Sequence, residues 1–240
     1  MATKIQRVRI VADSNPCNPR TEWDCHAGRM ICWHRRYNLG DEHNYDCDDF
    51  IRELAFEACE GLEEKVDRLE NDVYSRLYDR AVDNDRDDPN EYAGRLVGNK
   101  VDKYVESIVR DGYVILPLFL MDHSGISMST GSFNCPWDSG QVGWIVCDNE
   151  TIQREFNGDR ELAEKCLQLE VEVYDQYLTG DVYGFIVEER EECKECGHFD
   201  WEEVDSCWGF YGSDVRTNGM AEHLNADLVE LAKLADVEYC

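Results

Sequence analysis

An apolar stripe between residues 61 and 111 constrains the fold more than any other feature of the chain. From Gly61 onward, apolar side chains recur at steps of four and three, at Leu62, Val66, Leu69, Val73 and Leu77. This spacing places them on one face of a helix, and that face must be buried against another element. The acidic turn DNDRDDPN (83–90) follows, and Pro89 is suited to open a second helix that reaches about Arg110. The pattern predicts an antiparallel helical hairpin.

After Gly112 the pattern changes to short apolar runs separated by glycine, asparagine and proline, which predict strands. Further helices are expected at about 149–156, 159–178 and 219–235. We therefore expect an α+β fold with a mixed or antiparallel sheet of about five strands, packed helices and an acidic helical hairpin.

Three segments make up the expected organisation. Residues 1–45 hold a strand from Ile5 to Ala12 and an irregular stretch that contains cysteine and histidine. Residues 46–111 hold the acidic helical hairpin, and residues 112–240 hold a sheet-containing α+β core with a cysteine knuckle. We expect the three to form one compact unit.

The charge of the chain excludes some classes of partner. Its 52 acidic and 24 basic residues give a formal net charge of −28, spread along the whole length. Such a charge repels nucleic acid and anionic membranes, so we expect no direct nucleic-acid binding and no membrane association. A basic partner is favoured instead, and rows of carboxylates can imitate phosphates in a channel that normally receives DNA or RNA. An alternative is an acidic interaction module of a salt-adapted organism or virus, which the excess of arginine (17) over lysine (7) also suits.

The exposed faces of the hairpin are the candidate partner-binding surface. Carboxylates four residues apart on a helix lie about 6 Å from one another, close to the spacing of successive phosphates. The predicted contact residues are Glu63, Glu64, Asp67, Glu70, Asp72, Asp79, Asp83, Asp85, Asp87 and Asp88.

Twelve cysteines raise the question of disulfides or metal. The N-terminal MATKIQRVRIVAD has no apolar signal segment, and no stretch approaches the length of a membrane span. We therefore expect a cytoplasmic protein, within a host cell, whose cysteines are reduced, buried or metal-bound.

The pair Cys193-x-x-Cys196 is the strongest local chemical signal, because two thiolates on a tight turn can reach one tetrahedral ion. The predicted ligands of a structural zinc are Cys193, Cys196, Cys207 and His198. His198 follows Cys196 so closely that a donor from elsewhere in the chain is an alternative, and so is a set of cysteines without metal.

A second group of possible donors lies near the N-terminus, and its spacings match no standard zinc finger. It consists of Cys17, Cys25, His26, Cys32, His34, His43 and Cys47. A structural role is favoured for these residues, although one of them could join Cys193 and Cys196.

Two further stretches suggest a site. Asp122 and His123 could serve a metal-dependent enzyme, but adjacent residues on a strand face opposite sides, so a partner from Asp138, Asp175 or Asp181 would be needed. The favoured interpretation is a turn shaped by Asp122, Ser124 and Gly125.

The stretch Tyr174 to Tyr177, at the end of a helix, could line a pocket or only pack on the sheet. The sequence contains no phosphate-binding glycine motif, and we expect no enzyme.

Four segments carry a resemblance. They are CWHRRYNLGDEH (32–43), the stretch from LPLFLMDHSGISMST to CPWDSGQVGWI (116–145), VEVYDQYLTGDVYGF (171–185) and EVDSCWGFYG (203–212). Together they resemble a family of small proteins encoded by bacteriophages and other mobile elements, which implies an origin more than a mechanism. Acidic proteins of such elements often imitate DNA to inhibit host defence. By this analogy of class we expect an anti-CRISPR or antirestriction protein whose partner, a CRISPR effector or restriction enzyme, has a basic channel.

Overall fold

The computed structural model describes residues 5–190 and 200–239, which fall into two compact units. Unit 1 comprises Met1–His26, Leu118–Val142 and Gln168–Cys240, and unit 2 comprises Ala27–Pro117 and Gly143–Leu167. Three elements continue from one unit into the other: β3 (Tyr113–Asp122), β5 (Ser139–Asp148) and α6 (Arg160–Thr179). Each unit is therefore assembled from segments that are distant in the sequence.

The α+β class is confirmed. The described part of the chain forms seven α-helices and two four-stranded sheets. The first sheet has the strand order β7 (Glu202–Tyr211), β6 (Val182–Arg190), β1 (Ile5–Ala12), β8 (Val237–Glu238), and the second has the order β2 (Arg29–Cys32), β5, β3, β4 (Ile126–Ser129). The strands are thus divided between two sheets, where the sequence led us to expect one sheet of about five strands.

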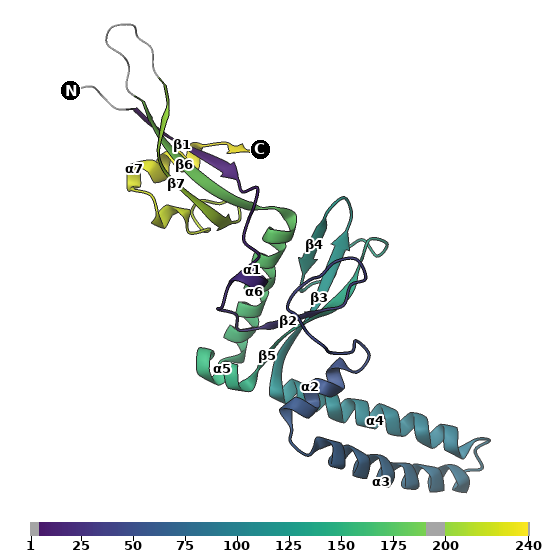
Figure 1. The fold of residues 1–240 in the computed structure, drawn as a ribbon. Coiled ribbons are helices and arrows are strands. Elements are labelled where there is room, and N and C mark those ends of the chain that lie inside the picture. The colour runs from purple at the N-terminus through teal and green to yellow at the C-terminus, as the bar shows by residue number, and fades with distance from the viewer. Residues whose placement is uncertain (1–4, 191–199, 240) are drawn as a thin grey trace, which may run out of the picture. The chain divides into compact units, whose positions relative to one another are not determined.

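The first sheet belongs to unit 1. Its strands are β1 (Ile5–Ala12), β6 (Val182–Arg190), β7 (Glu202–Tyr211) and the short β8 (Val237–Glu238). Strand β1 is antiparallel to β6 and parallel to β8, so the sheet is mixed. The 3-10 helix η1 (Met220–Glu222) and helix α7 (Ala226–Leu234) supply Met220 and Leu228 to the core that Ile10 and Phe185 form on the sheet. Helix α7 lies beside this sheet (Figure 1).

Two smaller elements complete unit 1. Helix α1 (Pro19–Glu22) carries Arg20, whose side chain is 1% exposed and whose guanidinium donates to Glu170 of α6 at 2.9 Å. Strand β4 (Ile126–Ser129) returns antiparallel to the end of β3, with Asp122 opposite Ile126. Ser124 has a φ of +59° in the connection, and the His123 amide donates to the Gly125 carbonyl. The turn predicted for these residues is confirmed.

Unit 2 contains the helical hairpin. Helix α3 (Leu62–Asp83) and helix α4 (Pro89–Gly112) lie side by side and antiparallel (Figure 1). Apolar side chains of α3 and a row of valines on α4 are buried against one another and against α2 (Phe50–Ala58). Pro89 occupies the first turn of α4, where Asp88 caps the helix by accepting from the Glu91 amide at 2.9 Å. The predicted hairpin is confirmed.

The rest of unit 2 holds strand β2 (Arg29–Cys32), which is antiparallel to β5 with Cys32 opposite Gly143. Helix α5 (Asn149–Phe156) follows β5, capped by Asp148 through the Thr151 amide. Across the described ranges, no helix is both long enough and apolar enough to traverse a membrane.

Candidate functional site

The predicted partner-binding carboxylates lie on α3 and on the loop that follows it. Of the ten, nine are exposed and Glu70 is half-buried. Glu64 pairs with Arg68 at 3.3 Å, and Asp88 caps α4. The other eight side chains form no hydrogen bond or ion pair with any residue that the structure describes. They are Glu63, Asp67, Glu70, Asp72, Asp79, Asp83, Asp85 and Asp87.

The two helices of the hairpin differ in charge. Helix α3 has seven acidic and four basic residues, whereas α4 has four of each. The acidic surface is therefore α3 with its following loop, and it does not extend over the whole hairpin. A larger surplus lies in residues 182–240, with 15 acidic and four basic residues. Part of it is the edge strand β7, where Glu202, Glu203 and Asp205 are exposed.

Of the four predicted zinc ligands, only Cys207 belongs to the described residues. Cys193, Cys196 and His198 lie outside the described residues, whereas Cys207 is half-buried on β7, opposite Phe185. Within the ranges 5–190 and 200–239, no three His, Cys, Asp or Glu side chains are placed to hold a metal ion. The structural zinc stays a prediction.

The N-terminal donors have separate environments. Cys17, Cys25 and Cys47 are exposed, Cys32 is buried, and none of the four is in a disulfide. His26 contacts the Pro19 carbonyl at 2.8 Å, and His34 stacks on Tyr37. His43 Nε2 lies 3.0 Å from the Cys32 carbonyl oxygen, so it is the nitrogen that carries the proton. Its buried Nδ1 has no hydrogen-bond partner in the described part of the chain.

His123 has a carboxylate partner, which is Asp138. His123 Nδ1 lies 3.1 Å from Asp138 Oδ2, and the Cys135 thiol donates to the same oxygen at 3.5 Å. The Asp122 amide donates to the Asp138 carbonyl at 2.8 Å. The His123 side chain is 70% exposed, so these groups lie on the surface. An enzymatic role of Asp122 and His123 stays a prediction.

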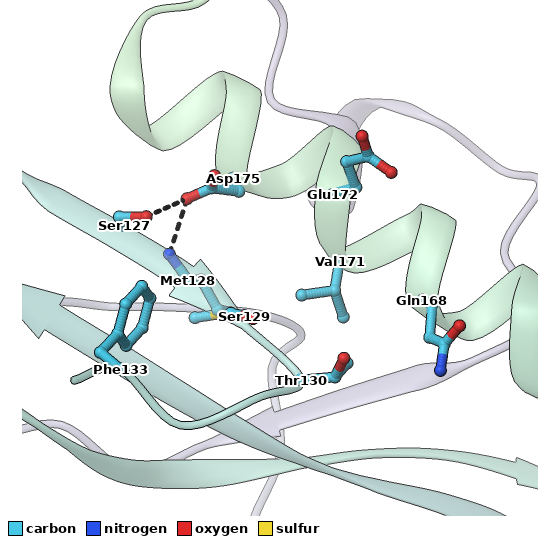
Figure 2. Close-up of a pocket in the computed structure, with 9 residues that line it drawn as sticks. All are labelled: Ser127, Met128, Ser129, Thr130, Phe133, Gln168, Val171, Glu172 and Asp175. Atoms are coloured by element: carbon cyan, nitrogen blue, oxygen red, sulfur yellow. Dashed lines mark hydrogen bonds between the residues drawn. The ribbon is translucent and has the colours of Figure 1, made fainter.

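A pocket of about 450 Å³ opens in unit 1 between β4 and α6 (Figure 2). One wall consists of β4 and the residues after it, and the other wall belongs to α6. The lining residues of α6 are three or four positions apart, so they share one face of the helix. The lining residues are Ser127, Met128, Ser129, Thr130, Phe133, Gln168, Val171, Glu172 and Asp175.

Asp175 joins the two walls of the pocket. Its Oδ1 accepts a hydrogen bond from the Ser127 hydroxyl at 2.8 Å and from the Met128 amide at 2.7 Å (Figure 2). Strand β4 is the last strand of its sheet, so its outer amides lack a strand partner. The carboxylate of Asp175 takes the place of a strand carbonyl.

Sequence reasoning found only part of this pocket. It placed Asp175 at a helix end that could line a pocket, and Asp175 does so, whereas the neighbouring Tyr174 is buried in the core. It offered no sign that residues 127–130 lie opposite. Two of the segments that carry the resemblance, 116–145 and 171–185, both contribute to the lining.

Comparison with known proteins gave no match to a family model, a curated protein or a solved structure. The resemblance to proteins of bacteriophages and mobile elements stays a prediction that rests on the four segments alone.

Proposed function

We propose that this chain is an inhibitor, encoded by a phage or another mobile element, of a host defence system that targets nucleic acid. In this role it is an anti-CRISPR or antirestriction protein that acts in the cytoplasm of the host cell. It occupies a basic DNA- or RNA-binding channel with the carboxylates of α3 and the loop after it.

The observation that carries the proposal is the row of unpaired, exposed carboxylates on α3. A helix of 22 residues is roughly 33 Å long and holds its side chains at fixed positions. Lysine and arginine side chains of a partner can therefore pair with these carboxylates without first breaking ion pairs within the chain. Long-range attraction would accelerate association, and affinity would fall as salt screens it.

The experiment is a pull-down of the tagged chain from lysates of candidate hosts, with mass spectrometry of the proteins that bind at low salt and elute at high salt. We expect a CRISPR effector or a restriction enzyme, displaced by competing DNA. Affinity for the purified partner that does not change between low and high salt would contradict the proposal.

Two variants with the same change in charge locate the surface. The first neutralises α3 through Glu63→Gln, Asp67→Asn, Asp79→Asn and Asp83→Asn. The second neutralises four exposed residues elsewhere through Glu164→Gln, Glu202→Gln, Asp205→Asn and Glu222→Gln. We expect the first to weaken binding at least about ten-fold and the second to have a much smaller effect. Equal losses would show that overall charge, and not α3, governs binding.

A second function is supported by the distribution of charge. The surplus of acidic over basic residues is larger in residues 182–240 of unit 1 than on α3 of unit 2, and α4 has no such surplus. Carboxylates are therefore spread over both units and are not concentrated on the hairpin. This distribution suits an interaction module of a salt-adapted organism or virus, in which acidity serves solvation. The two functions differ in the expected dependence of folding on salt: the module would fold only in molar salt, whereas the inhibitor would fold in dilute buffer.

A further inference from the structure

We propose that the pocket between β4 and α6 binds an organic cation, in the form of a guanidinium or primary ammonium group on a short apolar stem. The side chains that line the pocket carry charge of one sign. Among its nine lining residues, Glu172 and Asp175 are acidic and none is lysine, arginine or histidine. A cleft lined by one sign of charge concentrates ions of the opposite sign, and the net charge of −28 adds to the same field.

One carboxylate of the pocket, that of Asp175, is already held in position. Ser127 and Met128 hold Oδ1 of Asp175, which fixes the orientation of the group before a ligand arrives. Oδ2 of Asp175 forms no hydrogen bond with the described residues and remains available as an acceptor. An acceptor that needs no reordering gives more affinity than a mobile one.

Glu172 is a second carboxylate of the pocket and lies near Asp175 on α6. It is exposed and stands three residues before Asp175 on the same face of α6. Side chains at this spacing have Cβ atoms about 5–6 Å apart. In Figure 2 the two carboxylates point in different directions, so a guanidinium donates to both only when the exposed Glu172 side chain turns toward Asp175.

The pocket also has apolar side chains that suit the stem of the ligand. Met128, Phe133 and Val171 supply apolar contacts beside the acidic groups (Figure 2). The ring of Phe133 can also receive a cation on its face. A volume of about 450 Å³ suits a small molecule or one long side chain.

Recognition through the backbone of β4 is disfavoured. A peptide that extended the sheet would need the outer amide of Met128, which already donates to Asp175. The cation is therefore recognised by side chains, and it belongs either to a free small molecule or to an arginine or lysine of another protein.

Calorimetric titration of the full chain at low ionic strength tests the proposal with three probes. Agmatine represents a free guanidinium, and acetyl-Gly-Arg-Gly-amide represents a protein side chain. The citrulline analogue of that peptide is a neutral control of nearly the same shape. We expect saturable one-site binding of at least one cationic probe, and the tighter of the two identifies the source. Failure of both cations to bind, or equal binding of the citrulline peptide, overturns the proposal.

Variants separate the pocket from the general acidity of the chain. We expect Glu172→Gln to weaken binding of the cationic probe about ten-fold, as for the loss of a hydrogen bond between charged groups. Asp175→Asn should have a similar effect, but it also alters the contact with β4, so Glu172→Gln is the decisive variant. Glu222→Gln is the matched control, because it removes the same charge from an exposed position outside the pocket. A loss of affinity in the control as large as in Glu172→Gln would show that the pocket is not the site.

This inference is independent of the function proposed for α3. The variant that neutralises α3 should bind the cationic probe as the wild type does, so either proposal can fail without the other.

Discussion

Arg20 is a deeply buried charged residue, and Glu170 forms an ion pair with it. The two side chains are 1% and 13% exposed and lie 2.9 Å apart. Burial of a charged pair contributes little net stability, but removal of one partner deprives the other of an ion pair in a medium of low polarity, where that loss is costly.

We therefore expect Glu170→Ala to lower the free energy of unfolding by about 3–5 kcal/mol. Urea denaturation of the full chain measures the loss. Glu172→Ala is the control, because it removes an exposed carboxylate from the same helix and should change stability by no more than about 0.5 kcal/mol. Similar losses in both variants would mean that the buried pair has no special role.

Glu57 is the centre of a polar group in unit 2. It accepts from the Tyr45 hydroxyl at 2.6 Å, from Arg29 at 3.0 Å and from the Tyr113 hydroxyl at 3.3 Å. Partial burial opposes ionisation of Glu57, but the hydrogen bonds from Tyr45 and Arg29, with the charge of Arg29, outweigh it and lower the pKa below 4.5. Burial, and then the charge of Glu57, raises the pKa of Tyr113 to about 12.

These shifts predict a dependence of stability on pH. Because the pKa of Glu57 is lower in the folded state than in the unfolded state, its ionisation stabilises the fold above the ordinary value of 4.5. That contribution is lost as the pH falls through the lowered pKa. We expect Glu57→Gln to flatten the acid side of the stability profile between roughly pH 6 and pH 3. The same variant should lower the pKa of Tyr113, followed by tyrosinate absorbance, and an unchanged pKa would contradict the assigned network.

At the scale of elements, the pairing of β2 with β5 depends on one glycine. Gly143 lies opposite Cys32, and a Cβ atom at this position would collide with the Ile31 carbonyl oxygen and lie 2.9 Å from Cys32 Cα. Backbone atoms cannot move aside as a flexible side chain can, so this strand pair tolerates no side chain there.

We expect Gly143→Ala to destabilise the protein by about 1–3 kcal/mol and to reduce the protection of the β2 amides from hydrogen exchange. Gly140→Ala lies on the same strand, with no atom within 4 Å of the added Cβ, and is the control. Its effect should stay within about 0.5 kcal/mol. Unchanged protection of β2 in Gly143→Ala would contradict the register.

The elements show which parts of a fold can be inferred from sequence. Helices α3, α4 and α5 were predicted nearly to their ends, because apolar periodicity and a proline in the first turn, as at Pro89, are local signals. The division into two sheets was not predicted, because strand order depends on contacts between distant segments. The pocket was not predicted for the same reason, because Ser127 and Asp175 on its two walls are 48 residues apart. Neither residue indicates by itself that β4 is an edge strand.

At the scale of the whole molecule, the net charge of −28 sets the response to salt. Mutual repulsion of surface carboxylates opposes compaction, and salt screens it. If α3 serves as an imitation of nucleic acid, the chain must fold in the dilute conditions in which it meets its partner.

We therefore expect a cooperative thermal unfolding transition in dilute buffer, with a modest rise in the transition temperature in about 1 M KCl. Circular dichroism at both salt concentrations provides the measurement. A chain that folds only in molar salt would favour the salt-adapted module and would count against the inhibitor.

The contact between Asp175 and the Met128 amide also concerns the time before the fold is complete. Strands β3 and β4 are close in sequence and can form a hairpin early, whereas α6 reaches them from about 40 residues further along the chain. Until the carboxylate arrives, the outer edge of β4 can template a strand from a second copy. Before Asp175 reaches the Met128 amide, docking of α6 competes with pairing between two chains. The yield of refolded protein should therefore fall as protein concentration rises, and it should fall more steeply in Asp175→Asn.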